Sequence, residues 1–456
     1  MSQVKDMTKG TPAKLLLFFA IPLMLGNLFQ QLYTMVDTII VGQGVGVEAL
    51  ASLGAADWLN WLFLGLVTGI TQGFSILFSQ FFGAGKTDKL KQSVGNALIL
   101  TVISAVVMTA FGEILVTPIL RLLNTPDNIF PGAVQYLRVI FAGIPIILFY
   151  NLGASILRAL GNSKSPLVAM IIAALVNIVL DLLFVMVFHW GIIGAAVATV
   201  IAQCVSMVYC FVVLKKIDCI IPRKEDYTLE SNMCIQLFKL GMPVMFQNTV
   251  ISVGGMAVQY VINGFGFLFV AGFTATNKLY GLLETAAISY GFSMTTYTAQ
   301  NLGAGKYDRI RTGMKNALLM ALGTSLLISV LMLVFGKQIL LLFISGNGEQ
   351  TTEVLKIAYH YLSIMSYFLM VLYALHVYRC ALQGLGDTFT PMLSGIAEFV
   401  MRVSAALLLP RLMGQEGIYY AEILAWTGAT VILVISYYHR ANKMFEGKEK
   451  YKSASR

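Results

Sequence analysis

Long, uninterrupted apolar runs are the feature that most constrains how this chain can fold. They include LLLFFAIPLMLGNLFQQLYTMV from Leu15, LILTVISAVVMTAFGEILV from Leu98 and LLMALGTSLLISVLMLVFG from Leu318. Each run is close to the ~20 residues that an α-helix needs to cross a hydrocarbon core of ~30 Å. Only 12% of the residues are charged, whereas a soluble domain carries about 25%. The sequence therefore predicts an all-α polytopic membrane protein.

Charged residues, Gly and Pro divide the apolar runs into twelve predicted transmembrane helices. Their approximate ranges are 15–42, 48–82, 93–118, 132–155, 166–188, 192–215, 235–262, 268–301, 314–340, 357–383, 391–411 and 417–439. Most of the 31 Lys and Arg residues then fall on one side of the membrane, which predicts that both termini are cytoplasmic. This bias also explains the net charge of +9, so we expect the lipid bilayer of the plasma (inner) membrane and no nucleic acid as a partner.

The second constraint is an internal repeat. GAGKTDKLKQSVGNAL begins at Gly83, and GAGKYDRIRTGMKNAL begins at Gly303. Three more pairs of matching segments keep the same order, around Pro22 and Pro243, from Leu50 and Val270, and up to Pro166 and Pro391. Each half holds an even number of predicted helices, so both halves enter the membrane from the same side. Parallel repeats of this kind build transporters whose substrate site lies between the halves.

We therefore predict two pseudo-symmetric six-helix lobes around a central cavity. The predicted parts are an N-terminal lobe at 1–215, a cytoplasmic linker at 216–234, a C-terminal lobe at 235–440 and a basic cytoplasmic tail at 441–456.

The repeated segment also raises a competing interpretation, a phosphate-binding loop, because Gly85 to Thr87 reads GKT. That motif needs a glycine five positions before its GK pair, and position 80 is Gln80. The second copy has Tyr307 in place of the hydroxyl that would hold Mg²⁺. An ATP-driven pump is therefore not predicted. We interpret the segment as a tight turn between helices, with Asp88 and Asp308 as caps of the next helix.

Ionisable residues inside predicted spans are costly and usually face a cavity or a partner. Asp37 lies within the first span and Asp181 within the fifth, with Asn177 four residues earlier on the same helix face. Two carboxylates with amide and hydroxyl oxygens could coordinate a hard cation such as Na⁺. The same carboxylates could instead carry a proton, and either use would couple an ion to transport.

The second half carries its own intramembrane charges. Glu398 and Arg402 are spaced four residues apart in the eleventh span, which predicts either a neutralised structural pair or a polar patch that lines a cavity. Glu284 in the eighth span has no partner by sequence, and His376 is the histidine best placed to reach a cavity. These four residues are candidate substrate-cavity residues.

The chain resembles the MATE family, the multidrug and toxic compound extrusion transporters. The resemblance covers nearly the whole length and rests on AIPLMLGNLFQQLYTMVDTIIVG, GAGKTDKLK with its repeat, ILRALGNSKSP and ALVNIVLDLLFV followed by GIIGAAVATVIAQ. It implies two six-helix lobes in a V and export of organic cations and other amphipathic compounds against inward Na⁺ or H⁺. It implies no enzyme activity and no cofactor beyond the coupling ion, and we expect a monomer.

The resemblance is strongest to the DNA-damage-inducible (DinF-like) branch. In that branch an N-lobe cation site is built from positions that look like Asp37, Asn177, Asp181 and Thr199, which would also be the metal ligands if the ion is Na⁺. The surrounding polar positions look like Tyr136 and Asn151, and helix spacing near Asp37 adds Gln30 and Gln31. The norfloxacin-pump branch has a carboxylate where this chain has Ile251, so ion coupling is expected in the N lobe.

The sequence thus predicts a cation-coupled multidrug antiporter that works by alternating access. The alternative within the same superfamily is a flippase for lipid-linked oligosaccharides. Its cavity should be cationic to hold pyrophosphate, whereas the intramembrane charges here are mainly acidic. A channel or receptor is a different class and is disfavoured by the two-lobe repeat.

Overall fold

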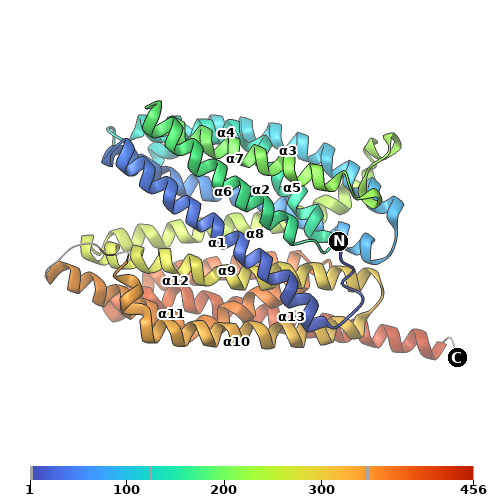
Figure 1. Ribbon diagram of the computed structural model, residues 1–456. Helices are drawn as coiled ribbons and strands as arrows, with labels where there is room; N and C mark the ends of the chain where they lie inside the picture. Colours follow the sequence, from blue (N-terminus) through green and yellow to red (C-terminus); the bar gives the residue numbers. More distant parts are fainter. Residues whose placement is uncertain (1–3, 124, 343, 345–348, 455–456) are drawn as a thin grey trace. The chain divides into compact units, whose positions relative to one another are not determined.

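The computed structural model describes residues 4–123, 125–342, 344 and 349–454, and within these ranges the backbone is almost entirely helical (Figure 1). The first half contains α1 (Pro12–Gly44), α2 (Val47–Gly83), α3 (Thr87–Leu122), α4 (Phe130–Ala142), α5 (Ile144–Ala159), α6 (Lys164–Asp181), the π-helix η1 (Leu182–Val187) and α7 (Gly191–Leu214). Two 3₁₀ turns follow, η2 (Asp218–Ile220) and η3 (Lys224–Tyr227). The second half contains α8 (Ser231–Asn263), α9 (Phe267–Gly303), α10 (Tyr307–Leu340), α11 (Glu349–Gly384), α12 (Phe389–Met413), η4 (Gly414–Ile418) and α13 (Tyr419–Ala454).

All twelve predicted helices occur in the described ranges. The predicted fourth helix consists of α4 and α5, which meet at a bend of 49°, and the predicted fifth consists of α6 and η1. By length and apolar composition alone, eight of the described helical stretches could cross a membrane, or nine with the bent pair. One of these stretches, Phe389–Met444, comprises α12, η4 and most of α13. The fold class predicted from the apolar runs is confirmed.

The chain divides into two compact units. Unit 1 comprises residues 1–7 and 21–245, and unit 2 comprises residues 8–20 and 246–456. The first part of α1 therefore belongs to unit 2, and the first part of α8 belongs to unit 1. Each change of unit falls beside the one proline inside that helix, Pro22 in α1 and Pro243 in α8. A proline removes one backbone hydrogen bond from a helix. Each helix therefore passes from one unit to the other close to a missing backbone hydrogen bond.

The first part of α8 contacts another helix of unit 1, and the first part of α1 contacts another helix of unit 2. In unit 1, a Cβ atom on Gly73 of α2 would lie 2.3 Å from the Cα atom of Gly241 in α8, so glycine lets these two backbones approach. In unit 2, the hydroxyl of Ser293 in α9 donates a hydrogen bond to the carbonyl oxygen of Leu16 in α1 at 3.0 Å. The packing of α2 on the start of α8 is thus matched by the packing of α9 on the start of α1.

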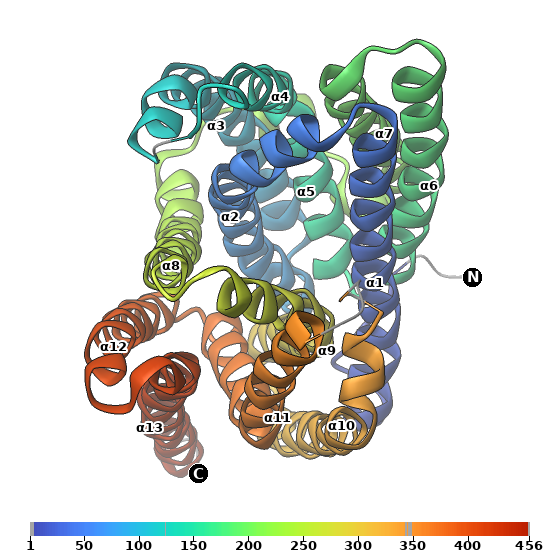
Figure 2. The ribbon, with the colours of Figure 1, turned by 90° about the vertical axis from the view of Figure 1, so that its left-hand side faces the viewer.

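The helices pair in the same way inside both units. In unit 1, α2 and α3 contact the bent pair α4–α5, α5 contacts α7, and α6 contacts α7. In unit 2, α9 and α10 contact α11, α11 contacts α13, and α12 contacts α13. Figure 2 shows α9, α10 and α11 grouped together and α12 beside α13. The sequence repeat therefore corresponds to a repeat of helix packing.

The repeated GAGK segment forms the same turn in both units. Gly85 and Gly305 have φ angles of 68° and 66°, a left-handed conformation that glycine adopts without a steric penalty. The amide of Lys86 donates to the Phe81 carbonyl and that of Gly85 to the Phe82 carbonyl, which closes a Schellman motif. The expectation that Asp88 and Asp308 cap the next helices is wrong. The capping positions are Lys86 and Lys306, and each aspartate lies in the first helical turn.

A second matched pair of turns precedes α6 and α12. The side-chain oxygen of Asn162 accepts a hydrogen bond from the Ser165 amide at 3.0 Å, and Asp387 accepts one from the Thr390 amide at 3.0 Å. Asp387 also forms an ion pair with Arg440 of α13 at 2.9 Å. The two halves therefore share the capping geometry, and only the second adds a charge partner.

Candidate cation site and buried ionic cluster

The first candidate site lies in unit 1, where α1, α6 and α7 contribute polar side chains. Asn177 and Asp181 stand one turn apart on α6 and are fully buried, and Asp37 of α1 is 8% exposed. The Asn177 Nδ2 atom donates to the Thr199 Oγ1 atom of α7 across 3.5 Å. Asp37 and Asp181 lie within electrostatic reach of each other. The structure thus brings together the four residues that the sequence suggested as a cation site.

Five buried oxygen atoms around this point accept no hydrogen bond from the described residues. They are Asp37 Oδ1, Asn177 Oδ1, Asp181 Oδ1, Asp181 Oδ2 and Gln203 Oε1. Buried polar atoms nearly always have partners, so a group of five without donors is unusual. Carboxylate and amide oxygens are ligands that a hard cation such as Na⁺ prefers. Protonation of the carboxylates would instead add O–H groups that could donate hydrogen bonds. These oxygens are therefore suited to bind either Na⁺ or a proton.

Two residues that sequence reasoning missed belong to this region. Gln203 contributes one of the unsatisfied oxygens, and Tyr33 interacts with the side chains of Gln203 and Gln30. Gln203 follows Thr199 by four residues on α7, and Tyr33 precedes Asp37 by four residues on α1. The i,i+4 spacing that linked Asn177 to Asp181 would have identified both.

The other predicted first-half residues differ in how they relate to the carboxylates. Tyr136 of α4 is buried and lies within electrostatic reach of Asp37, and Gln30 reaches the region through Tyr33. Asn151 instead donates to the Ile147 carbonyl of its own helix at 2.9 Å. Gln31 is half-buried and makes no side-chain hydrogen bond among the described residues. The substrate-cavity role of all four stays a prediction.

The helix geometry changes beside Asp181. This residue ends α6, and the next six residues form the π-helix η1, in which the Phe188 amide reaches back to the Leu183 carbonyl at 2.9 Å. Such π segments are rare and often mark functional sites. A Cβ atom on Gly44 of α1 would lie 2.6 Å from Met186 Sδ in η1. The C-terminal end of α1 therefore packs tightly against the segment that follows Asp181.

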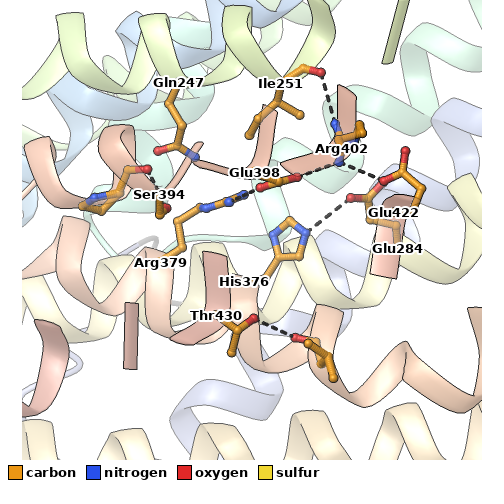
Figure 3. Close-up of polar contacts among 12 residues, drawn as sticks. Gln247, Ile251, Glu284, His376, Arg379, Ser394, Glu398, Arg402, Glu422 and Thr430 are labelled. Carbon is orange, nitrogen blue, oxygen red and sulfur yellow. Dashed lines mark hydrogen bonds and ion pairs between the residues drawn. The ribbon is translucent and has the colours of Figure 1, made fainter. Parts of the chain in front are cut away.

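The second half holds a buried ionic cluster, here called the unit 2 cluster, of Glu284, His376, Arg379, Glu398, Arg402 and Glu422 (Figure 3). Glu398 forms its centre and is only 4% exposed in its side chain. One carboxylate oxygen accepts from Arg379 Nη2 at 2.6 Å and the other from Arg402 Nη2 at 2.7 Å. The predicted Glu398–Arg402 pair is confirmed, and a second arginine extends it.

Arg402 joins two further helices, α13 and α8, to this centre. It forms an ion pair with Glu422 of α13 at 2.9 Å, and its Nη1 atom donates to the Ile251 carbonyl of α8 at 3.4 Å. The sequence analysis missed both Arg379 and Glu422. Neither residue has a charged partner close in the sequence, so no local pattern could have revealed these ion pairs.

Glu284 and His376 form the edge of the unit 2 cluster. The Nε2 atom of His376 in α11 lies 3.3 Å from Glu284 Oε1 in α9, and their side chains are 14% and 27% exposed. Figure 3 shows the two side chains next to the Arg402–Glu422 pair. The structure therefore gathers Glu284, His376, Glu398 and Arg402 in one place, as a connected cluster.

A comparison with sequence families identifies the class of protein. The MatE family model matches the chain twice, at residues 22–183 and 243–408. This chain belongs to the MATE family. The two matches lie one in each half, as the internal repeat requires. The chain is thus a membrane protein of the multidrug efflux MATE transporters, a family that consists of transporters and not, in general, of enzymes.

Curated relatives and solved structures agree with this placement. The chain is 30% identical over 422 residues to the "Probable multidrug resistance protein YpnP" of Bacillus subtilis (strain 168), which covers 91% of this chain and 92% of that protein. It is 28% identical over 433 residues to "Probable multidrug resistance protein YoeA" of the same organism, with 92% of each chain covered. A structure titled "Crystal structure of MATE in complex with MaL6" superposes with a TM-score of 0.90 at 22% identity, covering 97% of this chain and 99% of that one. The flippase alternative is not favoured by these similarities.

Proposed function

We propose that this MATE transporter is an antiporter that exports organic cations and amphipathic compounds in exchange for Na⁺ or H⁺ bound at Asp37, Asn177, Asp181 and Thr199. The observation that carries the proposal is the group of five buried oxygens without donors around the two aspartates. A bound ion would supply the missing positive charge, so ion binding here would stabilise a buried acidic group. The same four residues support the assignment of this protein to the DinF-like branch of the family.

The coupling follows from competition for negative charge. With both carboxylates ionised, unit 1 attracts a cationic substrate, and with an ion bound that attraction is lost. An ion can shift a conformational equilibrium only by its difference in affinity between the two states. The two proline positions, Pro22 in α1 and Pro243 in α8, lie where each helix passes from one unit to the other. We propose these positions as the bending points of alternating access, in a plasma-membrane monomer with both termini in the cytoplasm.

The deciding experiment is the efflux of a fluorescent cation from proteoliposomes under separately imposed Na⁺ and proton gradients. Export driven by one gradient identifies the coupling ion. Asp37→Asn should abolish the gradient-driven part, and the matched control Asp88→Asn, an exposed residue in the first turn of α3, should leave it intact. Undiminished gradient-driven export by Asp37→Asn would refute the proposed site.

A further inference from the structure

The acidic and basic groups of the unit 2 cluster do not balance. Glu284, Glu398 and Glu422 carry three negative charges, and Arg379 and Arg402 carry two positive charges. With a neutral imidazole at His376, one negative charge remains in a largely buried place. Uncompensated charge in the membrane interior costs at least a few kcal/mol. The cluster is therefore a place where one more positive charge is favourable.

The geometry locates the excess charge on Glu284. Both oxygens of Glu398 bond to arginines, and Glu422 bonds to Arg402. The one hydrogen-bond partner of Glu284 among the described residues is the ring of His376, which is uncharged unless protonated. Glu284 is also the most exposed acid of the cluster, at 27% of its side chain. Glu422 lies within electrostatic reach of Glu284 and strengthens the negative field there.

We propose that Glu284 anchors the positive group of an organic cation in unit 2, and that protonation of His376 displaces it. Histidine is the side chain that ordinarily changes charge in the physiological pH range. A neutral ring leaves Glu284 free to pair with the ligand. A protonated ring neutralises Glu284 across the 3.3 Å contact, so the cluster no longer gains from binding a cation. The proposal rests on organic cations being the substrates.

The titratable or charged groups that act on this pair come from α9, α11, α12 and α13. They are Tyr280 on α9, Tyr373 and Arg379 on α11, Glu398 and Arg402 on α12 and Glu422 on α13. The contribution of α8 is uncharged, through the carbonyl of Ile251. Arginine and tyrosine keep their usual charge states over the physiological pH range, and two of the three glutamates are bonded to arginine. His376 is therefore the group of this cluster suited to respond to pH.

Equilibrium binding of tetraphenylphosphonium to the full-length protein in lipid nanodiscs tests the proposal. The wild type should bind about tenfold more weakly at about pH 5.5 than at about pH 8. Glu284→Gln should lose about tenfold in affinity at the higher pH and show little further loss at the lower one. The control Glu353→Gln removes the same charge from an exposed position of α11 and should bind like the wild type. Wild-type affinity and pH dependence in Glu284→Gln would overturn the proposal.

His376→Gln provides a second, independent measurement in case Glu284→Gln fails to fold. It should bind normally at the higher pH and lose less affinity than the wild type on acidification. An unchanged pH dependence would also overturn the proposal.

Repeating both measurements with Asp37→Asn separates this proposal from the proposed ion site. The effects of Glu284 and His376 should persist there, because Asp37 belongs to unit 1. If Glu284→Gln behaves like the wild type while Asp37→Asn abolishes ion-driven export, the unit 2 anchor is wrong and the antiport mechanism stands. If Asp37→Asn exports normally while Glu284→Gln loses binding, the proposed ion site is wrong and the unit 2 anchor stands.

Discussion

The two halves of this transporter share their helix pairing but surround their buried acids differently. In unit 1, Asp37 lies near two other acids, Asp181 and Asp57. In unit 2, Glu398 lies between Arg379 and Arg402, and both of its oxygens are bonded. A repeated scaffold can thus hold one set of carboxylates with oxygens that accept no hydrogen bond from the described residues, and another set that is largely neutralised by arginine.

This difference predicts how each half responds when one of its buried acids is replaced. Removing an acid from the uncompensated group relieves repulsion, whereas removing one from the compensated group leaves arginines unpaired. The same chemical change, a carboxylate to an amide, should therefore have opposite effects on the two halves.

Glu398→Gln should have the largest effect on stability. The substitution leaves Arg379 and Arg402 buried without their shared carboxylate, and breaking a buried ion pair costs about 3–5 kcal/mol. We expect a clearly lower midpoint of thermal unfolding in detergent. A midpoint equal to that of the wild type would show that the unit 2 cluster does not hold α11 and α12 together.

Asp181→Asn should impair function without such a loss of stability. It removes a negative charge from beside Asp37, so its unfolding midpoint should equal or exceed that of the wild type. Ion-driven export should fall roughly 5- to 150-fold, which is the fold-change that corresponds to typical coupling free energies between two sites. Transport in proteoliposomes and thermal unfolding of the same preparation measure the two effects. A lower unfolding midpoint for Asp181→Asn would contradict the prediction that loss of a buried acid destabilises only unit 2.

The matched helix caps offer a smaller test of the same comparison. Asn162→Ala and Asp387→Ala each remove a side-chain acceptor that caps a helix, at a cost of about 1 kcal/mol. Asp387 also pairs with Arg440 at 2.9 Å, so its substitution should destabilise the protein more. Thermal unfolding of Arg440→Gln and of the double variant isolates the ion pair. Equal losses for the two cap variants would mean that the pair contributes nothing.

The smallest effect is expected for Glu113→Gln. Glu113 lies 3.8 Å from Arg138, and their side chains are 36% and 58% exposed. Partly exposed pairs of this kind contribute about 0–1 kcal/mol. The unfolding midpoint should shift little, and ion-driven export should be unchanged. A large shift would show that charge near the helix ends matters as much as charge inside the units.

Features that depend on nearby residues or on the repeat could be predicted from the sequence. Apolar runs predicted all twelve helices, since the length of a membrane-spanning helix is set by the hydrocarbon thickness. The aligned GAGK segments predicted two turns that require glycine at Gly85 and Gly305. The i,i+4 spacing identified Asn177 with Asp181 and Glu398 with Arg402, because residues four apart share a helix face.

Tertiary structure alone decided which helices bring their polar groups together. From α11, Arg379 reaches Glu398 of α12 and His376 meets Glu284 of α9, and neither contact follows from a local sequence spacing. The exchange of helix segments between the two units at Pro22 and Pro243 is also absent from any local pattern. Pairing between helices depends on how their side chains pack, and packing involves residues that no sequence period relates. The repeat predicted two similar halves, and only the folded chain revealed that arginines neutralise most of the buried acids in one half.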